Sequence, residues 1–163
     1  MVRKALTTDV PQMIALAAKK REEYEEFAPT FWHRSQDAAE KQTAFFHAQL
    51  TRANTLCLVC EHAGQLDGSL IAGITTAPPV YDPGSLVCIV DDYTVADPAQ
   101  WATVGKQLLE EARRLARCQG ADLTVVVCGH RDESKRRMLE AAGLYIASDD
   151  RATGRYFGTG YSV

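Results

Sequence analysis

Two periodicities in the apolar residues divide the chain into helices and strands. Where apolar residues recur every three or four positions, as Val10, Met13 and Ala17 do, the spacing predicts a helix with one buried face. Where β-branched residues alternate with polar ones or form short apolar runs, the pattern predicts strands. Helices are therefore expected over 10–28, 35–51, 98–117 and 132–142, and strands over 2–6, 55–61, 69–77, 86–95, 123–128, 144–147 and 155–159.

Turn residues between the strands indicate how they pair. Gly64 and the pair 67–68 predict an antiparallel hairpin, and the polar stretch 149–154 predicts a second one near the C-terminus. The apolar run 123–128 is typical of a strand buried on both faces with a parallel neighbour, and the helix before it supplies the crossover. The sequence therefore predicts an α/β (α+β) fold with a mixed sheet flanked by helices.

Length and charge narrow the classes of function. A chain of 163 residues with 46% hydrophobic and 24% charged residues predicts one soluble domain over 1–163, with no membrane span and no secretory leader, hence a cytoplasmic protein. The net charge of −3 argues against nucleic acid as the partner. Residues 101–163 carry 10 Lys/Arg against 8 Asp/Glu, which favours this half for a phosphate-rich ligand.

The five cysteines give no metal site. Cys57 and Cys60 lie in one predicted strand, where their spacing sends them to opposite faces, so they cannot share an ion. All five are interpreted as small reduced core residues, and His33 and His47 as structural. No metal cofactor is expected.

The passage from the strand 86–95 into the next helix is the first candidate binding site. Asp97 and Pro98 are typical of a helix start, so a strand is expected to lead directly into a helix N-terminus. Free backbone N–H groups and the positive end of the helix dipole favour a phosphate there. Every strand-to-helix turn has such amides, so the junction alone does not identify a ligand.

Residues at this junction match a family signature. Gln100, Gly105 and the pair Leu108 and Leu109 fit Gln/Arg-x-x-Gly-x-Gly/Ala followed by two leucines, and Asp132 with Gly143 fits a second marker, Asn and a later Gly. With the order of elements, these residues resemble the GNAT superfamily of acyl-CoA-dependent N-acetyltransferases over essentially the whole chain. The resemblance implies a GNAT-like, mostly antiparallel sheet with one splayed parallel strand pair, and acetyl-CoA as co-substrate.

Three positions depart from the family pattern. Thr103 stands where a glycine is expected, so its side chain either crowds the diphosphate or offers it a hydroxyl. Trp101 either stacks on the ligand or closes the core. Leu139 stands where many relatives carry the tyrosine that protonates the departing thiolate, and Tyr93, Tyr145, Tyr156 or a water are the substitutes, with Tyr145 first.

The resemblance also implies which residues hold coenzyme A. Backbone groups beside the splay would bind the pantetheine and the acetyl carbonyl, the helix start would bind the diphosphate, and Arg131, Lys135, Arg136 or Arg137 would lie near the 3′-phosphate. The predicted cofactor-binding residues are Tyr93, Thr94, Val95, Gln100, Trp101, Ala102, Thr103, Val104, Gly105, Lys106, Asp132 and Lys135.

Asp91 and Asp92 are the predicted general base. As strand neighbours they should face opposite sides of the sheet, with one toward the substrate, where a half-buried carboxylate has a raised pKa. The alternative is that both bind backbone or arginine groups. Glu22, Glu26 and His33 are weaker candidates in the segment that lines the acceptor pocket in relatives.

Two functions remain open from the sequence. The first is transfer of an acetyl group from acetyl-CoA to a primary amine by direct attack in a ternary complex, by a monomer or a homodimer. The second is a GNAT-fold protein that binds coenzyme A or another ligand without turnover. An unrelated α/β nucleotide binder is disfavoured, because the hairpin comes first in the strand order.

Overall fold

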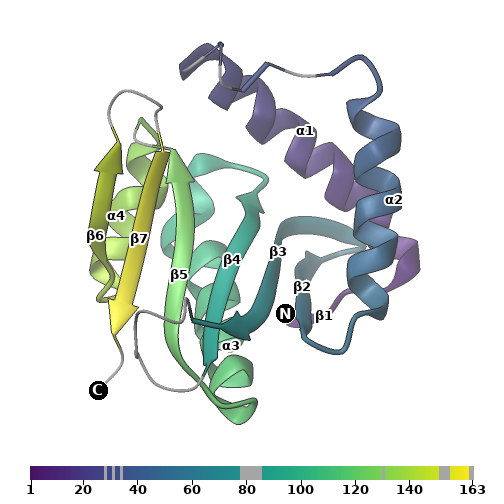
Figure 1. Ribbon diagram of the computed structural model, residues 1–163. Helices are drawn as coiled ribbons and strands as arrows, with labels where there is room; N and C mark the ends of the chain where they lie inside the picture. The colour runs from purple at the N-terminus through teal and green to yellow at the C-terminus, as the bar shows by residue number, and fades with distance from the viewer. Residues whose placement is uncertain are drawn as a thin grey trace.

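Seven strands form one sheet in the order β1-β2-β3-β4-β5-β7-β6 (Figure 1). The computed structural model describes residues 1–27, 29–30, 32–33, 35–77, 86–129, 131–150 and 155–161, with side chains described as far as residue 145. Of the predicted turn 149–154, residues 151–154 lie outside these residues. The strands are β1 (Val2–Lys4), β2 (Thr55–His62), β3 (Gln65–Thr76), β4 (Leu86–Val95), β5 (Ala121–Gly129), β6 (Tyr145–Asp150) and β7 (Arg155–Tyr161).

Helices cover both faces of the sheet and create two separate cores. On one face, α1 (Val10–Phe27) and α2 (Ala38–Thr51) pack over β2 and β3. On the other face, α3 (Val104–Cys118) packs over the middle of the sheet, and α4 (Glu133–Ala141) lies toward its β5-β7-β6 end (Figure 1). The predicted mixed, mostly antiparallel sheet flanked by helices is confirmed.

The cysteines follow the two cores. Cys57 belongs to the core under α1 and α2 and Cys60 to the core under α3, so the predicted opposite faces are confirmed. Cys88 and Cys128 are also buried. Cys118 is exposed, so the prediction of five core cysteines is wrong at this position: it is the last residue of α3, where the helix leaves the sheet.

The β2–β3 hairpin turns earlier than its sequence suggests. Ala63 (φ 50°) and Gly64 (φ 80°) form the turn, since both adopt the left-handed conformation that two-residue hairpin turns require. Asp67 and Gly68 therefore lie inside β3 rather than in the turn. Gly68 is needed there because a Cβ would come 2.9 Å from Val104 of α3.

The parallel strands β4 and β5 separate at their C-terminal ends. Pairing runs from Leu86–Ala121 to Val90–Val126 and stops, although β4 continues to Val95 and β5 to Gly129. The two ribbons diverge toward their arrowheads in Figure 1. This confirms the predicted splayed parallel pair, and we call the space between 91–95 and 127–129 the splay.

A β-bulge marks the point where the splay begins. Ile71 of β3 pairs with Asp92, whereas the next residue, Ala72, pairs with Val90, so Asp91 has no partner on β3. An extra residue of this kind bends its strand and increases the local twist. Because the bulge lies one residue after the last β4–β5 pair, it accounts for the divergence of β4 from its neighbour.

The junction between β4 and α3 is not the continuous helix that the sequence predicted. A 3-10 helix spans Pro98–Ala102, Thr103 (φ −115°, ψ −79°) interrupts it, and α3 begins only at Val104. The early turn is stabilised by Asp97, whose carboxylate accepts from the Ala99 amide at 2.8 Å. The first turn of α3 therefore lies after Gln100, at Val104, Gly105 and Lys106.

Trp101 fixes how this junction packs. Its side chain is only 2% exposed, and its ring stands edge-on to Tyr93 with 4.8 Å between ring centroids. A Cβ on Gly105 would lie 2.6 Å from the indole. Glycine at 105 is thus required by the tryptophan, and of the two roles expected for Trp101 the structure gives it the core one.

We expect Gly105→Ala to lower the free energy of unfolding by about 1–3 kcal/mol, because the added methyl group would overlap the buried Trp101 ring at 2.6 Å. Chemical denaturation measures this. Gly73→Ala, where a Cβ meets nothing within 4 Å, is the matched control and should change stability by less than about 1 kcal/mol. Equal effects of the two substitutions would contradict the packing role of Gly105.

Candidate functional site

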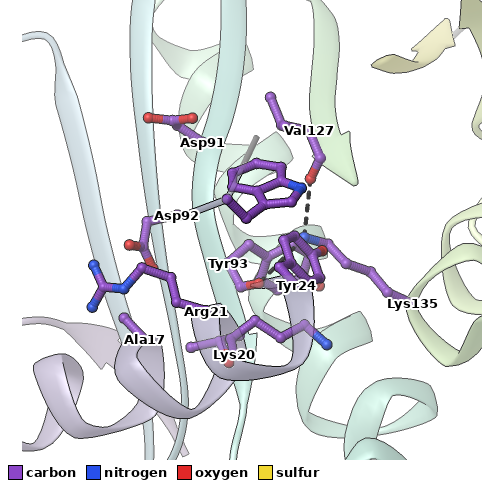
Figure 2. Close-up of a pocket in the computed structure, with 11 residues that line it drawn as sticks. Ala17, Lys20, Arg21, Tyr24, Asp91, Asp92, Tyr93, Val127 and Lys135 are labelled. Atoms are coloured by element: carbon purple, nitrogen blue, oxygen red, sulfur yellow. Dashed lines mark hydrogen bonds between the residues drawn. The ribbon is translucent and has the colours of Figure 1, made fainter. Parts of the chain in front are cut away.

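A cavity of about 190 Å³ opens beside the splay, between α1 and the C-terminal half of β4 (Figure 2). Its walls come from elements that are distant in sequence, namely one face of α1, the segment after α1, the bulged part of β4, β5 and α4. The lining residues are Ala17, Lys20, Arg21, Tyr24, Trp32, Asp91, Asp92, Tyr93, Thr94, Val127 and Lys135.

Both predicted carboxylates line this cavity. The expectation that Asp91 and Asp92 face opposite sides of the sheet is wrong, because the bulge at Asp91 breaks the alternation on which it rested. Asp91 is exposed and Asp92 is half-buried. Figure 2 shows both carboxylates at the cavity wall, above Arg21 of α1.

Asp92 has the environment of a poised acid or base. Burial raises its pKa to about 6, and the neighbouring Asp91 adds to this, while Arg21, Lys135 and a hydrogen bond from Gln42 act in the opposite direction. The Gln42 amide donates to the Asp92 carboxylate at 3.3 Å, and Arg21 donates to the same Gln42 side chain. A carboxylate with a pKa near 6 in a cavity suits proton transfer near neutral pH.

One face of α1 supplies side chains that the sequence analysis did not single out. Ala17, Lys20, Arg21 and Tyr24 all line the cavity, and their spacing of three and four residues places them on one stripe of the helix. This three- and four-residue spacing is the feature of the sequence that could have identified these cavity-lining residues. The sequence instead suggested Glu22 and Glu26 of the same helix as candidates for the general base. Both are exposed and neither lines the cavity.

Asp132 joins α1 to α4 across the mouth of the splay. Its carboxylate accepts from the Tyr24 hydroxyl at 3.1 Å and forms an ion pair with Lys20 at 2.6 Å, and it caps α4 through the Lys135 amide. The Tyr24 oxygen in turn accepts from the Gly129 amide at 3.1 Å. Asp132 was predicted to bind the cofactor, but its carboxylate already has three partners within the protein.

Lys135 lies inside the splay. The prediction placed it near a surface phosphate, but it is 2% exposed and its ammonium donates to the carbonyls of Tyr93, at 3.3 Å, and Val127, at 3.0 Å. Figure 2 shows the ammonium beside the Val127 carbonyl. Burial lowers the pKa of this lysine. Its position in α4, followed by two arginines, gave no sign of this.

Backbone groups of β4 point into the splay. Because Ala96 donates to Asp67 on the β3 side, strand alternation directs the N–H and C=O of Tyr93 and Val95 toward the opposite side. The bond from Lys135 to the Tyr93 carbonyl agrees with this direction. The splay is thus bordered by backbone donors and acceptors that have no strand partner on β5.

The start of α3 offers three backbone donors. Within the described part of the chain, no acceptor is found for the amides of Val104, Gly105 and Lys106, and no side chain caps this helix. Gln100 instead accepts from the Asp97 amide at 3.0 Å, and the Thr103 hydroxyl donates to the Gln100 carbonyl at 3.3 Å. Three unpaired amides at a helix N-terminus form a ready anion site.

Several predicted catalytic side chains lie elsewhere. Tyr145 is on β6, at the edge of the sheet, is 49% exposed and does not line the cavity, so this geometry gives no support to its predicted role as the general acid. It was favoured because it closely follows Gly143, but β7 separates its strand from β5. The Tyr93 hydroxyl donates to the Gly105 carbonyl, away from the cavity. His33 is exposed and pairs with Glu25. The Tyr156 side chain lies outside the described ones.

Solved structures of N-acetyltransferases have the same fold. The chain superposes on the PaiA N-acetyltransferase of Thermoplasma acidophilum in complex with coenzyme A with a TM-score of 0.72 at 13% identity, covering 99% of this chain and 98% of that one. For the ribosomal-protein-alanine N-acetyltransferase of Brucella melitensis the TM-score is 0.73 at 15% identity, covering 99% of both chains. For an aminoglycoside 6′-acetyltransferase type Ii it is 0.70 at 12%, covering 99% and 96%.

This chain has the GNAT fold. No family model and no curated protein matches its sequence, so the likeness rests on structure. One of these neighbours was solved with coenzyme A, and two features of this chain have chemistry that such a molecule needs: the unpaired amides at the start of α3 suit a diphosphate, and the backbone groups of Tyr93 and Val95 suit the amides of an extended arm. The Lys135 side chain occupies part of the splay, where its ammonium donates to the carbonyls of Tyr93 and Val127.

The described residues hold no group of three His, Cys, Asp or Glu side chains placed to bind a metal ion. In the same part of this GNAT-fold chain, no helix has the length and apolar character needed to cross a bilayer.

The raised pKa of Asp92 should make stability depend on pH. Because the folded pKa of about 6 exceeds the ordinary value of 3.8, the folded protein holds a proton that the unfolded chain releases, and the free energy of unfolding falls as pH rises between these values. Asp92→Asn has no carboxyl group to titrate at this position, so it does not lose this stability as pH rises. The variant should gain stability over the wild type from pH 4 to 6.5, by at most about 3 kcal/mol.

Urea denaturation across that pH range measures the difference, with Asp91→Asn as the matched change of one charge at the same bulge. If the difference in free energy of unfolding between Asp92→Asn and wild type does not change from pH 4 to 6.5, the assignment of a raised pKa to Asp92 is contradicted.

Proposed function

We propose that this protein is an acyl-CoA-dependent N-acetyltransferase that transfers an acetyl group to a primary amine by direct attack. The observation that carries the proposal is the splay of β4 from β5 beside three unpaired amides of α3, since this pairing of a gap with an anion site matches the shape of a thioester on a diphosphate-bearing carrier. The GNAT fold is consistent with it but does not decide it, because one fold hosts many functions.

The chain's own groups divide into three roles. The amides of Val104, Gly105 and Lys106 bind the diphosphate, and the Lys106 ammonium adds positive charge at the same helix start. The backbone of Val95 binds the arm. The Tyr93 amide, which points into the splay, donates to a carbonyl oxygen as that oxygen gains negative charge. When bound, acetyl-CoA supplies the acetyl group as an activated thioester.

Asp92 serves as the general base. Its carboxylate lies at the wall of the cavity that the acceptor enters, and its pKa of about 6 leaves it ionised at neutral pH but basic enough to take a proton from the acceptor nitrogen. The free amine then attacks the thioester carbonyl, the C–S bond breaks, and water protonates the departing thiolate. Gln42 holds the carboxylate from the α2 side. Asp91, exposed beside it, attracts a cationic acceptor to the cavity mouth.

Two measurements test the proposal. Calorimetry with acetyl-CoA tests binding, and thiol release from acetyl-CoA in the presence of a panel of primary amines tests turnover. We expect binding in the micromolar to millimolar range and amine-dependent thiol release with at least one acceptor. No binding at millimolar acetyl-CoA, with the protein shown to be folded, would overturn the function.

Asp92→Asn should lower kcat/KM for the acceptor by about 10²- to 10⁴-fold, because the amide cannot accept the proton. The acidic limb of the wild-type pH profile, with an apparent pKa near 6, should disappear in the variant. Acetyl-CoA affinity should stay within about threefold of wild type. Asp91→Asn is the comparison and should lose less than about 10-fold in rate.

A second function is favoured by one observation. Neither the Tyr93 nor the Tyr145 hydroxyl faces the cavity, so the tyrosines considered for protonating a departing thiolate are not placed to do so. This arrangement suits a GNAT-fold protein that binds coenzyme A or another ligand without turnover. Binding of acetyl-CoA with no thiol release for any amine tested would decide for this second function.

A further inference from the structure

Lys135 takes the place of the strand pairing that is lost in the splay. The carbonyls of Tyr93 on β4 and Val127 on β5 face one ammonium group, which donates to both. Toward the N-terminal ends of β4 and β5 the two strands pair directly, from Leu86–Ala121 to Val90–Val126. One lysine from α4 thus connects the two walls of the splay through its side chain.

The surroundings of the ammonium stabilise it in the interior. It lies 5.0 Å from the centroid of the Tyr93 ring and 5.3 Å from that of Trp101, where the faces of aromatic rings favour a cation. The side chain is 2% exposed, and removal from water would be unfavourable without these contacts. Asp132 and Asp92 favour its charge and Lys20 opposes it.

The same two carbonyls border the volume that an arm in the splay has to fill. A chain with amide groups entering between β4 and β5 would bond to the unpaired backbone of Tyr93 and Val95, but the Tyr93 carbonyl is already used by Lys135, whose ammonium also reaches across to Val127. The arm and the lysine side chain therefore compete for one volume and for the Tyr93 carbonyl.

We propose that Lys135 is a specificity-determining residue that closes the splay, so that the arm of an acyl-CoA enters only when the lysine side chain leaves. The proposal rests on the proposed function for the identity of the ligand. Lys135 selects against the arm and not against the nucleotide, because the unpaired amides of Val104, Gly105 and Lys106 lie at the start of α3 and form no hydrogen bond with the two carbonyls that Lys135 binds.

The test compares two ligands on two variants by calorimetry. Coenzyme A carries both the nucleotide and the arm, whereas adenosine 3′,5′-bisphosphate carries no arm. Lys135→Ala should bind coenzyme A about 10-fold more tightly than wild type or better, because the arm no longer displaces two hydrogen bonds. Its affinity for the bisphosphate should be unchanged or weaker, since one positive charge is lost.

Arg114→Ala is the matched control for charge. Arg114 is an exposed residue of α3 that pairs with Glu111 at 2.8 Å and lies outside the cavity, so its removal should tighten neither ligand. If Lys135→Ala does not fold, Lys135→Met fills the same space without a hydrogen-bond donor, and it should still bind coenzyme A more tightly than wild type. Thermal melting by circular dichroism verifies folding.

The outcomes separate this inference from the proposed function. Tighter coenzyme A binding by the folded variant supports the role of Lys135, even if the wild type binds none and the acetyltransferase function falls. Equal or weaker binding of coenzyme A by the folded variant overturns the role of Lys135, while wild-type binding and thiol release leave the acetyltransferase intact. A gain for the bisphosphate as large as that for coenzyme A also overturns it.

Discussion

The loss of hydrogen-bond pairing between β4 and β5 beyond Val90 and Val126 is the constraint from which the other features of the site follow. A sheet that opens leaves backbone groups without partners, and buried backbone groups without partners are unfavourable. Two features of the structure accompany this loss of pairing. The bulge at Asp91 turns β4 away, which creates the cavity, and the ammonium of Lys135 satisfies one carbonyl on each strand.

Burial at the splay shifts the pKa values of two groups of opposite charge, Asp92 and Lys135. Burial raises the pKa of Asp92 and lowers that of Lys135, so each group is shifted toward its neutral form, while the attraction between them acts in the opposite direction. The charge state of either residue therefore depends on the other. A ligand that displaced the lysine would remove a cation from the surroundings of Asp92 and raise the pKa of that carboxylate further.

Periodicity and turn residues were sufficient for the order of the elements, the hairpins and the parallel pair, because these depend on local patterns of apolar and polar residues. They were insufficient where a position is decided by a distant contact. Asp91 and Asp92 share a cavity only because of a bulge that no local pattern indicates, and Lys135 reads as helix surface beside two arginines. Tyr24 meets Asp132 across 108 residues of sequence, so its role required the fold.

Helix α1 connects β2 and β3 to the β5 wall of the splay. Its N-terminal half packs through Val10, Met13 and Ala17 against β2 and β3, and its C-terminal half is bonded through Tyr24 to Gly129 and Asp132, at the far wall. A helix is stiff along its axis, so α1 holds the β5 wall at a fixed distance from β2 and β3. Because β4 is paired to β3, widening the splay would break these contacts, and a ligand that enters has to displace side chains instead.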